Sequence, residues 1–162
     1  DCAHGKHMTK RTSIAVRPFV QAELPQALAL VEKVFLAFEA PEYSAEGIQT
    51  FLSFLQDTKA IAALRFCGAW EKDMLLGVLA TRGGSHIALF FVDAAHQGQG
   101  IGRALFEAAK SACAVGRMTV NSSPYAVEIY RKLGFSPLSD EQVRDGIRFT
   151  PMQYSFEKEY SL

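Results

Sequence analysis

The 162-residue chain lacks the features that mark membrane, fibrous or disordered proteins. Its 17 basic and 17 acidic residues cancel, so no overall field draws it to nucleic acid or to a membrane surface. No apolar run approaches the roughly 20 residues that cross a bilayer. Internal repeats, linkers and low-complexity tracts are absent as well. The remaining expectation is one globular domain, for which 49% apolar residues supply a core.

Cysteine is scarce, and its spacing carries no pattern. The segment 1–7 (DCAHGKH) has no periodicity and precedes Met8, so we interpret it as an expression remnant and take 8–162 as the domain. Cys67 and Cys113 then remain, without a CxxC motif, so neither a metal framework nor a disulfide pattern is expected. With no signal peptide after Met8, we expect a cytoplasmic protein.

The hydrophobic periodicity predicts alternating strands and helices. Pro25 and an apolar stripe from Leu24 to Phe38 indicate a first helix that stops at Ala40-Pro41, and Ser44 suits the N-cap of a second helix. The segment Thr58 to Leu64 fits either an extension of that helix or a loop. Strands are expected at Thr12 to Phe19, Arg65 to Trp70, Met74 to Thr81, His86 to Val92 and Met118 to Val120, then at Phe135 and at Ile147 to Phe156.

The most apolar of these strands, His86 to Val92, is expected to be central and buried on both faces. It leads through a glycine-rich segment into a helix that starts at Ile101 and ends at Gly116, and a later helix covers Pro124 to Leu133. A polar loop is expected over Ser139 to Gly146. The pattern is α+β with a mixed sheet.

The strongest local signal is the segment QGQGIGR at 97–103, between the buried strand and an amphipathic helix. Glycines let a ligand approach the backbone, and the free N–H groups of a helix N-terminus suit a pyrophosphate. The same glycines could simply form a tight turn. A Rossmann fingerprint fails because Arg103 replaces its third glycine, and no Gly-Lys-Ser or Gly-Lys-Thr of a P-loop occurs.

The segment LFFVDAAHQGQGIGRALFEAA resembles the acetyl-CoA motif Q/R-x-x-G-x-G/A of the GNAT superfamily of N-acetyltransferases, and VNSSPYAVEIYRKLGF resembles its second landmark, a helix that carries Tyr and ends in LGF. The resemblance implies the GNAT fold, a mixed and mostly antiparallel sheet of six to seven strands flanked by about four helices. It also implies acetyl-CoA as co-substrate and no metal. The order and separation of the two landmarks agree with the family.

The resemblance implies cofactor contacts for twelve residues. The backbone of one strand segment would pair with the pantetheine arm, the glycine loop would hold the pyrophosphate, and one of two polar residues would add a contact. These residues are Phe90, Phe91 and Val92, then Gln97, Gly98, Gln99, Gly100, Ile101, Gly102 and Arg103, and finally Asn121 and Ser123. The family usually has Pro where Ala94 stands, and an aromatic residue or Arg where His96 stands; whether His96 touches a phosphate or only solvent stays open.

Acetyl transfer to an amine requires that one proton be removed and another supplied. Tyr130, four residues before Gly134, is where the family's Tyr points at the cofactor sulfur, so we interpret it as the acid; its spacing would equally suit a core aromatic. A phenol of pKa near 10 stays protonated at neutral pH, as a donor must. Direct transfer needs no nucleophilic cysteine.

The base is less constrained. His86 opens the strand that leads to the loop, and the histone-acetylating branch of the family has a catalytic Glu in the corresponding strand; His86 fits either a base or a strand-end residue without a role. The peptide-N-terminus branch takes its Glu from the fifth strand, where this chain has none. Glu39 and Tyr43 lie where family members shape the acceptor pocket, or else in a solvated loop.

The sequence therefore predicts an acetyl-CoA-dependent N-acetyltransferase that acts on a primary amine of a small molecule or peptide. No nucleic-acid or membrane partner is expected. The alternative is a catalytically silent CoA-binding sensor, motivated by the lack of an acidic base. A homodimer could pair through the edge of the strand Ile147 to Phe156.

Overall fold

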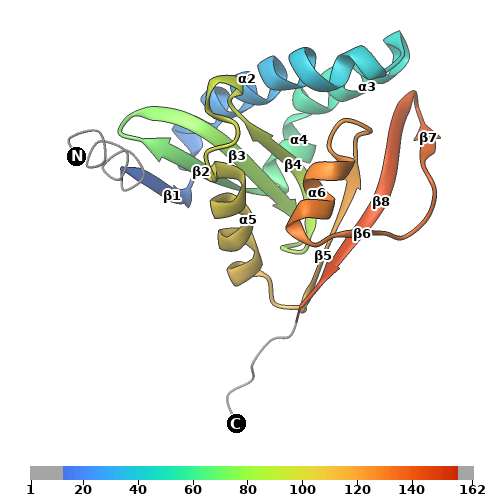
Figure 1. Cartoon of the computed structure of the whole chain (residues 1–162). Coiled ribbons are helices and arrows are strands. Elements are labelled where there is room, and N and C mark those ends of the chain that lie inside the picture. Colours follow the sequence, from blue (N-terminus) through green and yellow to red (C-terminus); the bar gives the residue numbers. More distant parts are fainter. Residues whose placement is uncertain (1–12, 157–162) are drawn as a thin grey trace, which may run out of the picture.

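The computed structural model of the chain describes residues 13–156. The segment 1–7, and Thr12 at the start of the first expected strand, lie outside the described residues. One open sheet and five α-helices make up this part of the chain (Figure 1). The strands are β1 (Ile14–Pro18), β2 (Leu64–Glu71), β3 (Met74–Arg82), β4 (His86–Val92), β5 (Arg117–Ser122), β6 (Ser136–Pro137), β7 (Gln142–Arg144) and β8 (Ile147–Ser155). The α-helices are α2 (Leu24–Val34), α3 (Ala45–Leu55), α4 (Thr58–Ala62), α5 (Ile101–Ala112) and α6 (Val127–Leu133).

The eight strands run in the order β1-β2-β3-β4-β5-β8-β6, with β7 paired to β8 off this path. Only β4 and β5 are parallel, so the expected mixed and mostly antiparallel sheet is confirmed. The strand number exceeds the six to seven expected because of β7, which has three residues, too short for any periodicity to show. The strand expected at Phe135 is β6, which begins one residue later. The strand β7 lies inside the segment that was expected to be a polar loop.

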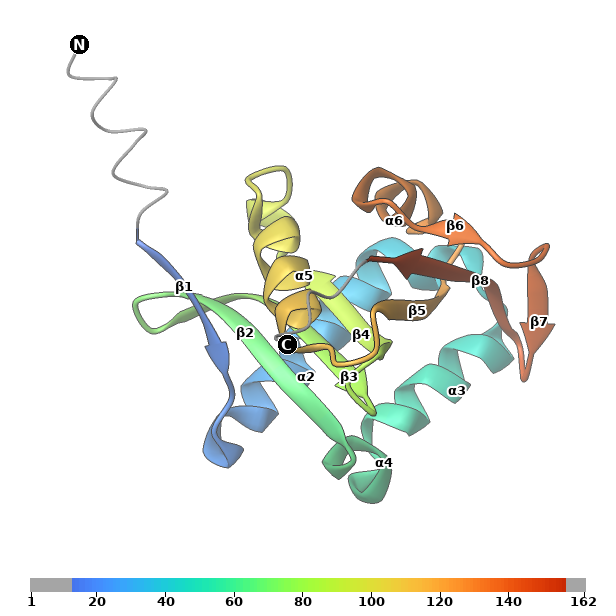
Figure 2. The same ribbon diagram turned by 90° about the horizontal axis from the view of Figure 1, so that it is seen from below.

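Helices cover both faces of the sheet (Figure 2). On one face, α2, α3 and α4 pack on the central strands around a cluster that includes Ala27, Val31, Leu55 and Leu89. On the other face, α5 and α6 cover two smaller clusters, around Leu105 and around Phe106, Tyr130 and Met152. The helix α4 is separate from α3 because the Asp57 carboxylate caps it, accepting from the Ala60 N–H at 3.1 Å.

The strand that is buried on both faces is β3, not β4. All seven interior residues of β3 are buried, whereas in β4 buried residues alternate with half-buried ones such as Ala88 and Phe90. The apolar composition of β4 therefore does not reflect burial on both faces, since one face lies under α2 and the other is only partly covered. That incomplete cover is what gives β4 a role in the site.

Two helix boundaries differ from expectation. The helix α5 ends at Ala112, and Gly116 (φ 74°) instead forms the turn into β5. The helix α6 starts at Val127 rather than at Pro124, because residues 124–126 form a turn. Within residues 13–156, β5 pairs with residues 150–155 of β8, and β6 and β7 pair with residues 152–153 and 147–149. Part of the edge expected for a homodimer is therefore already paired, and the homodimer stays a prediction.

The helix α2 continues into a π-helical turn, Phe35–Glu39, and then a 3₁₀ turn, Ala40–Glu42. The expected end of the helix at Ala40-Pro41 is thus confirmed, and the π-helical turn before it is a feature that the sequence did not indicate. A π turn widens the helix and redirects the side chains that follow, and such turns are frequent at functional sites. Among the described residues, no helix has the length and hydrophobicity needed to cross a membrane.

The β7–β8 turn lies directly against α3. Ser44 caps α3 as expected, with its hydroxyl accepting from the Gly47 N–H at 3.2 Å. A side chain at Gly47 would collide with the carbonyl of Gly146, and Thr50 donates to the carbonyl of Asp145 at 2.8 Å. The absence of a Cβ at Gly47 therefore lets the hairpin close on the helix.

We expect Gly47→Ala to lower the free energy of unfolding by about 1–3 kcal/mol, since the added methyl group must push the β7–β8 turn away from α3. Urea denaturation measures the change. Gln49→Ala, on the exposed face of the same helix, is the matched control and should stay close to the wild type. Equal stability of the two variants would contradict this account of the packing.

Candidate active site

The site begins where β4 and β5 part. These parallel strands share only two residue pairs, His86 with Thr119 and Ile87 with Val120. Within residues 13–156, no strand pairs with this edge of β4 beyond them (Figure 1). The Asp93 N–H bonds to β3, whereas the Val92 carbonyl accepts from the Gln97 side chain at 3.2 Å. Because backbone groups alternate in direction along a strand, Phe90 and Val92 point theirs toward the open edge.

A first cavity of about 300 Å³ lies beside this edge, between β4, the glycine loop and α6. We call it the cofactor cavity. Gly98 (φ 77°) and Gly100 (φ 84°) adopt left-handed conformations, and Gly100 is the N-cap of α5. The first α5 amide with an intrahelical partner is that of Ala104, bonded to the Gly100 carbonyl, so the preceding amides are free of such partners. Lining residues are Val34, Phe38, Glu39, Phe90, Phe91, Val92, His96, Gln97, Gly98, Ile101, Gly102, Tyr125, Ala126, Ile129 and Tyr130.

A second cavity of about 310 Å³, which we call the acceptor cavity, adjoins the first, and we call the residues that line both cavities their junction. The β7–β8 hairpin contributes Ile147 to its wall, and α3 contributes Thr50. Five residues line both cavities: Glu39, Phe90, Phe91, Ala126 and Tyr130. The remaining lining residues of the acceptor cavity are Tyr43, Phe51, Phe54, Arg82, His86, Ile87, Ala88, Val120, Asn121 and Ser123.

Glu39 is the one acidic residue that lines either cavity in the described part of the chain. Burial raises the pKa of its carboxyl to about 7, and the negative charge of Glu42 adds to the rise, while a hydrogen bond from the Ser123 hydroxyl opposes it. The same Ser123 oxygen accepts from the Ala126 N–H at 3.3 Å, which orients the hydroxyl. A carboxyl group with this pKa exchanges a proton readily near neutral pH.

Tyr130 lies at the same junction, with its ring packed edge-on against Phe90 and Phe135 at centroid distances of 6.0 and 5.3 Å. Burial raises the pKa of its phenol, and the negative charge of Glu39 raises it further. The hydroxyl therefore stays protonated at any physiological pH. Tyr130 therefore fits both interpretations of the sequence, because its ring is buried in the core and also lines both cavities.

His86 lies away from this junction. It lines the acceptor cavity but not the cofactor cavity, and its Nδ1 lies 2.8 Å from the Thr119 hydroxyl. Burial lowers the pKa of its imidazole, and the positive charge of Arg82 lowers it further. His86 is therefore neutral at pH 7, and along β4 it stands four residues from Phe90, the residue against which Tyr130 packs.

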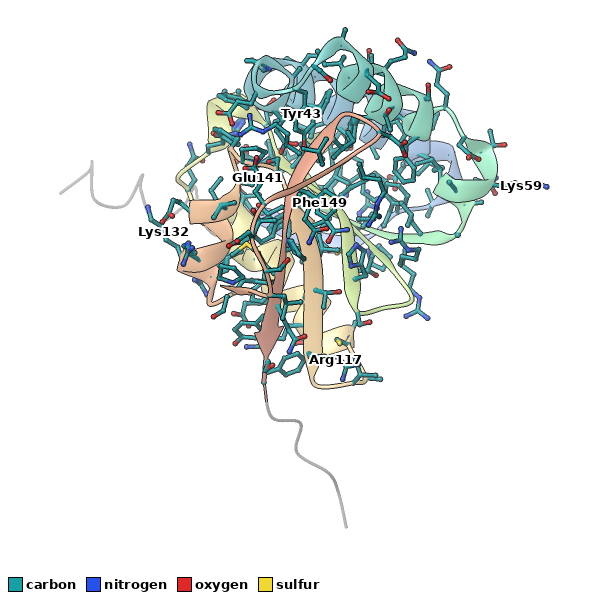
Figure 3. All side chains as sticks on the ribbon, turned by 90° about the vertical axis from the view of Figure 1, so that its right-hand side faces the viewer. Tyr43, Lys59, Arg117, Lys132, Glu141 and Phe149 are labelled. Atoms are coloured by element: carbon teal, nitrogen blue, oxygen red, sulfur yellow. The ribbon has the colours of Figure 1, made fainter. Side chains whose placement is uncertain are left out.

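The structure divides the other predicted residues between the two cavities. Asn121 and Ser123, expected at the cofactor, line the acceptor cavity, and Tyr43 lines it as expected. Figure 3 shows Tyr43 and Glu141 toward the same end of the molecule, with Arg117 at the opposite end. The side chain of His96, whose role was open, lies 2.8 Å from the Asp93 carboxylate in the wall of the cofactor cavity.

Three predicted residues of the glycine segment lie outside the cavity lining: Gln99, Gly100 and Arg103. Arg103 instead donates to the Lys132 carbonyl at 3.2 Å, which ties α5 to the end of α6. The sequence analysis missed Tyr125, which stacks on Phe38 at 5.4 Å across the cofactor cavity. It also missed Arg82 in the acceptor cavity, because no local pattern distinguishes that residue from any other strand-end cation.

A protein-family model, the acetyltransferase (GNAT) domain, matches residues 39–156. The chain belongs to the GNAT acetyltransferase family. The match begins at Glu39 and covers the strand parting, the glycine loop and α6. The resemblance in the two sequence motifs is thereby confirmed, and with it the assignment as an acyltransferase.

Solved structures share the GNAT fold over nearly their whole length. An N-acetyltransferase of Rhodopseudomonas palustris, described as GCN5-related and as a class-II aminotransferase, is 21% identical with a TM-score of 0.77 over 89% of this chain and 96% of that one. Apo YjaB of Escherichia coli is 26% identical, with a TM-score of 0.67 over 87% and 97%. PaiA N-acetyltransferase of Thermoplasma acidophilum, in complex with coenzyme A, is 18% identical, with a TM-score of 0.65 over 89% and 99%. A search of curated proteins finds no match.

Substitution of Gly100 tests whether the loop amides bind the cofactor. We expect Gly100→Ala to cost about 1–2 kcal/mol of stability, because a side chain disfavours the left-handed conformation of this N-cap. It should also weaken CoA binding about tenfold, the loss expected for one hydrogen bond to a charged group, since the α5 amides would be reoriented. Isothermal titration calorimetry with CoA and thermal denaturation measure the two effects.

Gly83→Ala is the matched control. Gly83 (φ 67°) has the same left-handed conformation, lines neither cavity, and a Cβ there would meet no atom within 4 Å. We expect this variant to lose a similar amount of stability and to keep its CoA affinity. Wild-type affinity in Gly100→Ala, or an equal loss of affinity in both variants, would refute the assignment of the loop amides to the cofactor.

Proposed function

We propose that the protein transfers the acetyl group of acetyl-CoA directly to the primary amine of a small molecule or peptide. The observation that carries the proposal is the meeting of the cofactor and acceptor cavities at Glu39 and Tyr130. The family supports acetyl transfer in general. The nature of the acceptor is inferred from this chain's own residues.

The residues of the cofactor cavity fit a CoA thioester. The open edge of β4 at Phe90 and Val92 suits the amides of a pantetheine arm, which would pair with it as an added strand does. The free amides at the start of α5 suit a pyrophosphate. When bound, acetyl-CoA supplies an acetyl group activated as a thioester. The PaiA structure in complex with coenzyme A supports this use of the fold.

Glu39 is proposed as the general base, a role that was first considered for His86. An alkylammonium of pKa near 10.4 is neutral in only about one molecule in 10³ at pH 7, so a group must take its proton. The Glu39 carboxyl, with a pKa of about 7, can accept that proton at the junction, whereas His86 lies at the other end of the acceptor cavity. The neutral nitrogen then forms its bond to the acetyl carbon as the carbon–sulfur bond breaks, and the further proton that the nitrogen loses restores the Tyr130 hydroxyl after it has protonated the sulfur.

Tyr130 is proposed as the proton donor to the departing sulfur. Its phenol is buried at the junction and is held protonated by its raised pKa, so a proton is available at the moment the thiolate forms. The ring contacts with Phe90 and Phe135 fix its position. Acid and base therefore lie together where the two cavities meet.

A catalytically silent CoA sensor was the alternative, on the ground that no acidic base was visible in the sequence. Glu39 is an acidic side chain that lines both cavities, so the lack of an acidic base no longer argues for a sensor. The cytoplasm is the compartment we propose. The thiols of Cys67 and Cys113 are free, as a reducing environment would keep them.

The pH dependence tests the role of Glu39. Since its carboxyl accepts a proton only when ionised, kcat/KM should fall as the pH drops below about 7. We expect Glu39→Gln to lower kcat/KM by about 10²-fold and to abolish this limb. The control Glu32→Gln, on the exposed surface of α2, should keep both rate and profile. A limb that persists in Glu39→Gln but disappears in His86→Ala would restore His86 as the base.

The second prediction concerns the hydroxyl of Tyr130. We expect Tyr130→Phe to lower kcat by about 10²-fold and to leave CoA affinity unchanged, because the ring contacts remain while the proton donor is lost. Tyr154→Phe removes a hydroxyl from the same aromatic cluster outside both cavities and should be silent. Steady-state kinetics and calorimetry with CoA separate the two effects. Unchanged turnover in Tyr130→Phe would exclude the acid role.

A further inference from the structure

The acceptor cavity has charges of opposite sign at its two ends. Glu39 stands at the junction with the cofactor cavity, and Arg82 and His86 stand at the other end, paired across β3 and β4. The wall between them is largely apolar and aromatic, with Phe51, Phe54 and the β4 residues that face them. The cavity is therefore polarised along its length.

The separation of the two ends follows from β5 and from Ser123, the residue directly after it. Thr119 contacts His86 at one end, and Ser123 bonds to Glu39 at the other. Four residues of extended chain correspond to about 13 Å, so the charged groups of a bound molecule would lie on the order of 10 Å apart. This is longer than the spacing within a simple α-amino acid.

Arg82 is exposed, and within residues 13–156 its side chain forms no ion pair or hydrogen bond. Arg82 lines the acceptor cavity beside His86, and its positive charge lowers the pKa of that imidazole. His86 Nδ1 lies 2.8 Å from the Thr119 hydroxyl. When that hydroxyl donates to Nδ1, the neutral ring carries its proton on Nε2, which can donate to an acceptor atom. A guanidinium and an imidazole donor side by side suit a carboxylate or phosphate oxygen.

The opposite rim carries excess negative charge. Glu42 and Glu141 both act electrostatically on Tyr43, and Arg148, the cation near them, is paired with Glu141 at 2.9 Å. An ammonium group is therefore attracted toward the Tyr43 and Glu39 side, and an anion is not. The two ends of the cavity thus select opposite charges.

We propose that the acceptor is an elongated primary amine with an apolar body and an anionic group at its far end, which Arg82 and His86 bind while the amine lies at Glu39. This inference rests on the proposed function, since it names the acceptor class of the same site. Arg82 acts on substrate binding and takes no part in the transfer of the acetyl group.

The experiment compares matched acceptors with acetyl-CoA: ω-amino alkanoates of increasing length, the corresponding ω-amino alkanamides, and ω-amino alkylphosphonates. Thiol release gives kcat and KM, and calorimetry in the presence of CoA measures acceptor binding directly. We expect the carboxylates to exceed their neutral amides about tenfold in kcat/KM, through KM, as for one hydrogen bond to a charged group. Phosphonates that match or exceed the carboxylates would identify a phosphate-bearing acceptor within the same class.

Arg82→Gln should raise KM and the dissociation constant for the anionic acceptors about tenfold and leave those for the amides unchanged, with kcat preserved. Arg82→Lys keeps the charge and should recover part of the affinity. Arg65→Gln, an exposed cation of β2 outside both cavities, is the control. Equal use of amides and carboxylates, or an equal effect of Arg82→Gln on both, would overturn the inference while acetyl transfer stands. Failure to acetylate any amine despite CoA binding would refute the proposed function itself, and this inference with it.

Discussion

The parting of β4 and β5 after two residue pairs is the constraint on which the site depends. A buried backbone N–H or C=O without a partner is costly, so a sheet seldom opens in its centre unless something satisfies the freed groups. Gln97 satisfies one of them by donating to the Val92 carbonyl. The remaining edge of β4 lies along a cavity, where a ligand with its own amides can complete the pairing. On the outer side, β5 stays fully paired to β8, so the opening is confined to one seam.

The opening between β4 and β5 also accounts for the raised pKa of Glu39, whose side chain lies beside it. Its folded-state pKa, about 7, lies above its ordinary value of 4.5. The stability associated with the neutral carboxyl is therefore fully present below pH 4.5 and is lost as the pH rises through 7. At the pH where the ionised carboxylate can act as a base, the protein bears the cost of a charge that is poorly solvated. That cost is consistent with a functional role, because a purely structural side chain at this position would be more stable without a charge.

The parts of the site that follow from local sequence were predictable, and the non-local parts were not. The glycine loop could be assigned because Gly98, Gly100 and the start of α5 are set by neighbouring residues. Whether β4 is covered on both faces depends instead on how far β5 runs beside it, and apolar composition carries no information about that register. The ionisation of Glu39 depends on its burial and on a hydrogen bond from Ser123, which is far away in the sequence. The two-residue strand β6 exists only because β8 is beside it.

His86 and Glu39 show how the fold reverses an expectation drawn from intrinsic acidity. An isolated imidazole, with a pKa near 6.5, is the better base at neutral pH, and an isolated carboxyl, near 4.3, is the poorer one. Burial penalises the charged form of each, so it lowers the pKa of His86 and raises that of Glu39. Desolvation thus brings the carboxyl to the pH at which a base is needed, at the junction of the two cavities. It leaves the imidazole neutral beside Arg82, where a hydrogen-bond donor is of more use than a base.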